Sequence, residues 1–175
     1  MPITNYDLMI DKEYLPGTLI TATGGTVQTR FNNTGNILFF GLGVVTGSGE
    51  RVIALPSTAN DKFEGVLMHT NTYEAREGYS KDATTGYYGY PDKREVSIIR
   101  PGEFAQVAVF VDSATAINDP VYVRYSATPG TTGLAGCFRK DDGTTTALEV
   151  TGARFIKVVA APTAGEMAIS WVEFS

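Results

Sequence analysis

Few residues of this chain have side chains that could carry out a reaction. The sequence has one histidine, His69 in VLMHTNT, and one cysteine, Cys137 in LAGCFRK. A histidine that acts as a general base needs a nucleophile and a positioned partner, and its strand-like surroundings favour a structural or surface role. We expect Cys137 to be a buried small apolar side chain. A Cys–His pair formed across the fold stays open, although no sequence pattern supports it.

The acidic residues are the other candidates for chemistry. Two carboxylates that meet in space could cleave a glycosidic bond, but Glu74 and Glu77 lie in a polar segment and Asp141 and Asp142 in an expected turn. With one His and one Cys, a classical zinc site would need carboxylates for the rest of its ligands. The glycine-rich GLGVVTGSG is followed by no helix and no Lys-Ser/Thr pair, so it lacks the parts of a phosphate-binding loop. The sequence therefore predicts no catalytic residues, no cofactor and no metal.

Composition narrows the class of protein further. The chain has 175 residues, of which 43% are hydrophobic and 19% charged, as in globular domains. Its net charge of −5 argues against a protein that binds nucleic acid, because such a protein needs a basic face. No apolar run is long enough to span a membrane, and the N-terminus lacks the pattern of a secretory signal. A single cysteine fits maturation in a reducing compartment.

The elements that must position these residues are predicted to be strands. Helical periodicity is almost absent, whereas short strand-like runs separated by turn signals recur, which is typical of a β-sandwich or barrel. Residues 36–45 predict one strand buried on both faces. Residues 136–150 predict a hairpin around Asp142-Gly143. In the strand that starts near Phe104, residues Val107, Val109 and Val111 share one face, and Phe110 lies on the other. The remaining predicted strands are 18–25, 27–31, 51–56, 63–73, 95–100, 120–126, 153–161 and 167–175.

Two segments depart from this rhythm. Residues 1–17 are expected to be an extended arm, and residues 18–175 a single β-rich domain. Within that domain, residues 74–94 form a polar, tyrosine-rich insertion, which is longer than a compact domain needs. Tyrosine is favoured at interfaces, and an apolar arm gains by ordering on a partner. The predicted partner-binding residues are Tyr6, Leu8, Ile10 and Tyr14 in the arm and Tyr79, Tyr87, Tyr88 and Tyr90 in the insertion.

Several segments of the sequence resemble the capsid cement proteins of tailed bacteriophages. They are NYDLMIDKEYLPG, ILFFGLGVV, LPS and FEGVLMHT in the first half, and VSIIRPGEFAQVAVF, DPVYV, GCF and GARFIKVVAAPTAGEMAISWVEF in the second. Together they cover most of the chain, and the motifs are short and structural. The insertion at 74–94 is longer than this family leads one to expect.

The resemblance implies a β-rich decoration protein on the outer surface of an icosahedral phage head. Such a protein is made in the host cytoplasm, becomes part of the virion, and bridges neighbouring major capsid subunits as a trimer or dimer. The main alternative is a virion-associated carbohydrate- or receptor-binding β-module, in which exposed tyrosines stack on sugars. A third possibility is a β-rich hydrolase, which loss of a detected activity on changing His69 would support.

Overall fold

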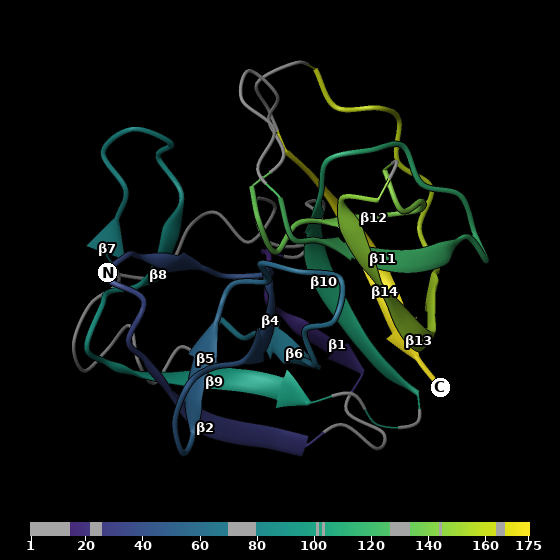
Figure 1. Cartoon of the computed structure of the whole chain (residues 1–175). Coiled ribbons are helices and arrows are strands. Elements are labelled where there is room, and N and C mark those ends of the chain that lie inside the picture. The colour runs from purple at the N-terminus through teal and green to yellow at the C-terminus, as the bar shows by residue number, and fades with distance from the viewer. Residues whose placement is uncertain are drawn as a thin grey trace, which may run out of the picture.

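Every regular element that the structure describes is a β-strand. The structure is a computed structural model, and it describes residues 15–21, 26–69, 80–100, 102, 104–126, 134–143, 145–163 and 167–175. These residues contain fourteen strands and no helix (Figure 1). The prediction of an all-β fold is therefore confirmed.

The first half of the chain closes a small barrel. Its strands pair in the order β2, β5, β4, β6 and β9, and the last pairs back with the first. They span Thr26–Asn32, Val52–Ala54, Gly43–Thr46, Phe63–Leu67 and Glu95–Arg100, respectively. The contact between β2 and β5 is parallel, and the other contacts are antiparallel. Closure leaves these strands without a free sheet edge.

The second half of the chain, together with β1 from its beginning, forms a six-stranded sheet beside this barrel (Figure 1). The strand order is β1, β10, β12, β11, β13 and β14. These strands span Leu19–Thr21, Ala105–Val111, Phe138–Arg139, Pro120–Arg124, Ala147–Phe155 and Ala168–Phe174, respectively. Strand β14 also pairs with the whole length of β10, from Ala105↔Phe174 to Val111↔Ala168. The last strand of the sheet, β14, therefore pairs with its second strand, β10, and β10 has hydrogen-bonded neighbours on both edges.

A third, smaller sheet corrects the prediction of one strand over 36–45. The run is split into β3 (Leu38–Phe39) and β4, and β3 pairs with β8 (Tyr88–Tyr90), which pairs in turn with β7 (Ser80–Lys81). The break lies at Gly41, whose φ is +76°. A Cβ there would lie 2.6 Å from that of Pro16. Glycine thus allows a close approach and a sharp change of direction, and the run serves two sheets.

The predicted hairpin around Asp142-Gly143 is also corrected. Strand β12 pairs with β11 and not with β13, and β13 pairs with the other edge of β11. The intervening turn is present, since the carbonyl of Asp142 accepts hydrogen bonds from the amides of Thr146 and Ala147 at 2.8 and 3.0 Å. The chain therefore turns where the sequence predicts, but it passes over the end of β11 instead of folding back on itself.

Two hydrophobic cores meet at β10. Val107, Val109 and Val111 belong to a valine-rich core, which β10 shares with the sheet strands and with β4, β6 and β9 of the barrel. Phe110 belongs to an aromatic core together with Phe39, Phe40, Tyr90, Cys137 and aliphatic neighbours. The predicted division of the β10 side chains between two faces is confirmed. Strand β10 is thus a wall between two cores, which explains why its sequence is apolar almost throughout.

Candidate partner-binding surface

The β7–β8 hairpin displays part of the predicted tyrosine-rich insertion. Its turn is ordered by Asp82, whose carboxylate accepts hydrogen bonds from the amides of Thr84 and Thr85 at 3.0 and 2.7 Å and from the Thr85 hydroxyl at 2.9 Å. The Thr85 amide is the largest of the causes that hold the pKa of Asp82 below its usual value. Across the turn, the amide of Asp82 donates to the Tyr87 carbonyl at 2.9 Å. The hairpin therefore has a defined shape from which side chains can be presented.

The three described tyrosines of this hairpin have different surroundings. Tyr90 is fully buried, donates its hydroxyl to the Met68 carbonyl at 2.8 Å and packs edge-on against Phe40 with ring centroids 5.1 Å apart. Its ring is part of the aromatic core, and it offers no surface to a partner in this fold. Tyr90 is therefore not part of the exposed surface of the hairpin.

Tyr87 and Tyr88 lie nearer to solvent. Tyr87 is half-buried, with its ring centroid 5.7 Å from Phe39 and 5.0 Å from Phe110 on β10. Tyr88 is 52% exposed, and the ammonium of Lys81 lies 5.5 Å from its ring centroid, in cation–π range. Tyr87 thus fastens the hairpin to β10, and Tyr88 is the ring that it presents.

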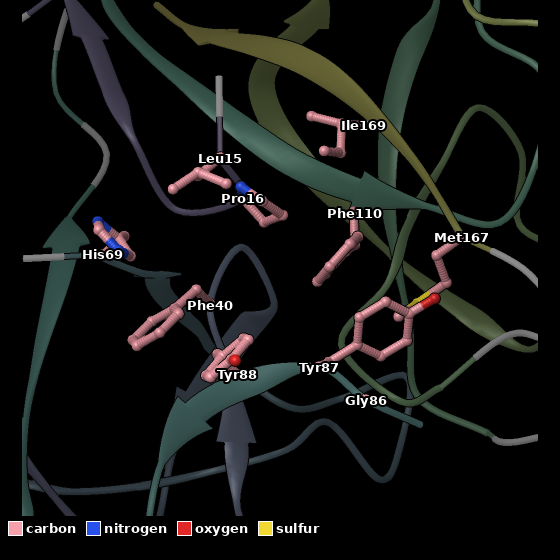
Figure 2. A pocket seen from close by; sticks show the side chains of 10 residues that line it. All are labelled: Leu15, Pro16, Phe40, His69, Gly86, Tyr87, Tyr88, Phe110, Met167 and Ile169. Atoms are coloured by element: carbon pink, nitrogen blue, oxygen red, sulfur yellow. The ribbon is translucent and has the colours of Figure 1, made fainter. Parts of the chain in front are cut away.

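An apolar pocket of about 510 Å³ opens beside these two tyrosines. Figure 2 shows Leu15 and Pro16 across the opening from them, with His69 and Phe40 at one side and Met167 at the other. The side chains come from β8, β10, β14 and the segments next to β1, β3 and β6. Its volume lies in the range of ligand-binding pockets. The complete lining is Leu15, Pro16, Phe40, His69, Gly86, Tyr87, Tyr88, Phe110, Met167 and Ile169.

The two residues with the most reactive side chains have packing roles. The ring of His69 stands edge-on to Phe40 with centroids 5.2 Å apart, and its amide donates to the Gly17 carbonyl at 2.9 Å. Cys137 is completely buried, and burial raises the pKa of its thiol to about 12. The thiol donates to the sulfur of Met167 at 2.9 Å. A thiol so reluctant to ionise is a poor nucleophile.

Charged groups in the interior are paired. The guanidinium Nε of Arg124 lies 2.5 Å from the carboxylate Oδ2 of Asp112, and both side chains are almost fully buried. Glu64 accepts hydrogen bonds from Arg30 and from the Thr46 hydroxyl. Burial opposes ionisation of Glu64, but these donors outweigh it, so its pKa is lowered. These two pairs join neighbouring parts of the fold, and each carboxylate in them is bound to a guanidinium.

The described residues include neither a cluster of metal ligands nor a helix that could span a membrane. No three of their His, Cys, Asp or Glu side chains are grouped as a metal ion would need. No helix that could cross a bilayer occurs in the part of the chain that the structure describes.

Five of the eight predicted partner-binding residues lie outside the described residues: Tyr6, Leu8, Ile10, Tyr14 and Tyr79. Of the rest, Tyr87 and Tyr88 come together at the pocket. Sequence reasoning missed most of the pocket, including Phe110, Met167 and Ile169, because these residues come from strands far apart in the chain. Their apolar character suits any buried strand, so no sequence signal distinguishes them.

Comparison with known proteins identifies the family of this chain. No curated protein matches it significantly. A solved structure titled "The capsid of Myoviridae Phage XM1" has a chain with a TM-score of 0.61 and 22% identity, over 99% of this chain and 97% of that one. At this identity the likeness shows the fold alone. The sequence pattern of the family described as "Structural cement protein (E217 gp24/Pam3 gp6)" matches residues 4–170. Because that match spans almost the whole chain, this protein belongs to the family of phage structural cement proteins.

Proposed function

We propose that this protein binds the outer surface of an icosahedral phage head and stabilises the contacts between major capsid subunits. The observation that carries the proposal is the family match over residues 4–170. The structurally similar chain comes from a phage capsid structure, which supports a location on the capsid. In this role the protein acts as a dimer or trimer, is not an enzyme, and is made in the host cytoplasm before it joins the virion.

The architecture suits a protein whose work is mechanical. Closed strands give a rigid body, and β10 ties its two halves together through both of its faces. The exposed ring of Tyr88 and the adjoining pocket provide apolar contact area, and aromatic rings are common anchors at interfaces. Residues 1–17 serve as a binding arm and residues 18–175 as one domain that carries the insertion at 74–94.

Survival of the particle tests this role. A protein that binds the assembled shell and not free subunits shifts the balance toward the shell by mass action. Emptied capsids that lack the protein should therefore survive heating or osmotic shock better once the protein is added back. Equal survival with and without it, at confirmed occupancy, would mean that it decorates the capsid without stabilising it.

A sugar- or receptor-binding role is the second candidate, because an exposed ring next to an apolar pocket is also how sugars are held. Against it, Lys81 lies over the ring of Tyr88, where a sugar would stack. Binding of the isolated protein to a glycan array, together with no binding to emptied capsids, would favour this second role.

A further inference from the structure

The lining of the apolar pocket beside Tyr88 indicates which kind of partner segment it can receive. Its lining is almost entirely apolar or aromatic, and two of its residues, Leu15 and Tyr88, are themselves 59% and 52% exposed. Large apolar surface left open to water is unusual on a protein that acts alone and marks a binding site. The lining residues include no charged pair or nucleophile that would suit a reaction. An apolar peptide segment suits such a pocket as its occupant.

The chain itself carries such a segment. Residues 1–14 lie outside the described residues, and they include the apolar run Leu8-Met9-Ile10. The run is flanked by Asp7, Asp11 and Glu13, against the single cation Lys12. At the pocket, the ammonium of Lys81 stands over the Tyr88 ring. The segment thus offers apolar side chains for the pocket and carboxylates for the neighbouring Lys81 ammonium.

The position at which residues 1–14 join the described fold helps to decide between two pockets, that of the same chain and that of a second copy. Leu15 and Pro16 form the rim of the pocket of their own chain. Because Leu15 precedes Pro16, extended backbone is favoured at Leu15, and a helical turn back toward the pocket is disfavoured at that residue. To fill its own pocket, the run 8–10 would have to reverse direction within the four residues 11–14, whereas the pocket of a second copy can be reached without a reversal. Five residues of extended chain reach roughly 17 Å, enough to cross to an adjacent molecule.

We infer that the pocket beside Tyr88 receives the Leu8-Met9-Ile10 segment of a second copy of this chain. Because each arm starts at the mouth of its own pocket, two or more copies around a symmetry axis can each give one arm and accept another. Such an exchange of identical elements is a common route to closed oligomers. The inference gives the proposed oligomer a specific contact, and it does not depend on capsid binding.

Disulfide trapping between two differently tagged full-length proteins tests this contact. One protein carries Ile10→Cys and the other Tyr88→Cys, and they are mixed and oxidised; the native Cys137 is buried with a raised thiol pKa and stays unreactive. The matched control replaces Tyr88→Cys by Val158→Cys, which is also exposed, at 64%, but does not line the pocket. We expect at least ten-fold more linked heterodimer with Tyr88→Cys than with the control. Adding Leu8→Asp to the Ile10→Cys protein should abolish the excess.

Two results would overturn the inference. The first comes from a third variant that carries both Ile10→Cys and Tyr88→Cys. If the disulfide forms only within a single chain of this variant, each arm fills its own pocket. The second is equal linkage to Tyr88→Cys and Val158→Cys, or none to either, both in free solution and on emptied capsids. The same preparations separate this inference from the cement role. Specific linkage in protein that does not bind capsids would keep the arm exchange and remove the cement proposal, and capsid binding without linkage would do the reverse.

Discussion

The valine-rich core and the aromatic core share strand β10 but are built in different ways. The first joins long strands in continuous register, such as the seven pairs from Ala105↔Phe174 to Val111↔Ala168. The second is completed by short strands, since β3 and β8 share only two pairs, and by edge-on aromatic contacts such as Tyr90 with Phe40. The long strands supply rigidity, and the short ones bring Tyr88 and the pocket to the surface. The experiments below test this division between scaffold and contact region.

The largest effect is expected in the valine-rich core. Phe155 on β13 is completely buried there. Replacing it by alanine removes buried apolar area and leaves a cavity that rigid, closed strands cannot fill. We expect Phe155→Ala to lower the free energy of unfolding by about 3–5 kcal/mol, measured by denaturant unfolding.

The matched control is Phe104→Ala, because that ring is 59% exposed. Its effect should stay within about 0.5 kcal/mol, as for ordinary surface positions. Similar losses at both positions would show that the valine-rich core is not the main source of stability.

The sequence predicted two features of the scaffold correctly: the two faces of β10 and the all-β class. The faces of β10 follow from the alternating direction of side chains along a strand, and the all-β class follows from the turn signals between short strands. The split of 36–45 could not be foreseen, because it depends on Gly41 packing against Pro16, twenty-five positions earlier. The wrong hairpin has a similar cause, since the turn at Asp142 is local but the insertion of β11 between β12 and β13 is not.

The candidate site was harder to predict than the fold. Tyr88 and Tyr90 share a face by strand alternation, yet one is half exposed and the other is fully buried. What separates them is cover from Phe40 and Met68, which lie directly after β3 and β6. The pocket is likewise assembled from residues that only the tertiary fold brings together.

The next largest effect concerns the short strands of the contact region. A Cβ on Gly89 would overlap the carbonyl oxygen of Leu38 and lie 2.6 Å from its carbonyl carbon. Gly89→Ala should therefore force β8 away from β3 and cost about 2–3 kcal/mol, as other overpacked sites do. Hydrogen exchange should show faster opening at the Phe40 amide, which donates to the Tyr88 carbonyl at 3.2 Å, while β10 stays protected.

Gly86→Ala provides the comparison within the same hairpin. Its nearest neighbour to an added Cβ is 3.8 Å away, so only the φ of +75° is unfavourable. We expect a cost of about 1 kcal/mol. An equal or larger loss at Gly86 would mean that backbone strain in the turn, and not the close β3–β8 approach, limits the hairpin.

A smaller effect, on binding and not on folding, is expected at Tyr88. Its exposed ring contributes little to the fold, so Tyr88→Ala should leave the unfolding midpoint near that of the wild type. If the ring anchors a partner, affinity for emptied capsids should fall by about 2 kcal/mol, more than ten-fold in Kd. Tyr87→Ala should reduce both stability and binding, because that ring packs on Phe39 and Phe110. Unchanged affinity for Tyr88→Ala, measured at saturating and limiting protein, would remove this ring from the contact region.

The smallest effect is a pH dependence at the edge of the scaffold. Glu173 on β14 accepts hydrogen bonds from Gln106 at 2.7 Å and from Arg154 at 2.9 Å, and these partners, Gln106 first, hold its pKa below the usual 4.5. A carboxyl whose pKa is lowered by folding contributes stability that is fully present above its unfolded pKa and is lost as the pH falls through the folded value. The difference in unfolding free energy between wild type and Glu173→Gln should therefore be constant from pH 7 to about pH 5 and shrink below that.

Arg154 is half exposed, which limits the difference to about 1 kcal/mol. Glu149→Gln, at an exposed position on β13, serves as the control for general charge effects. A Glu173→Gln difference that stays the same down to pH 3 would mean that this side chain holds β10, β13 and β14 together by packing and not by its charge.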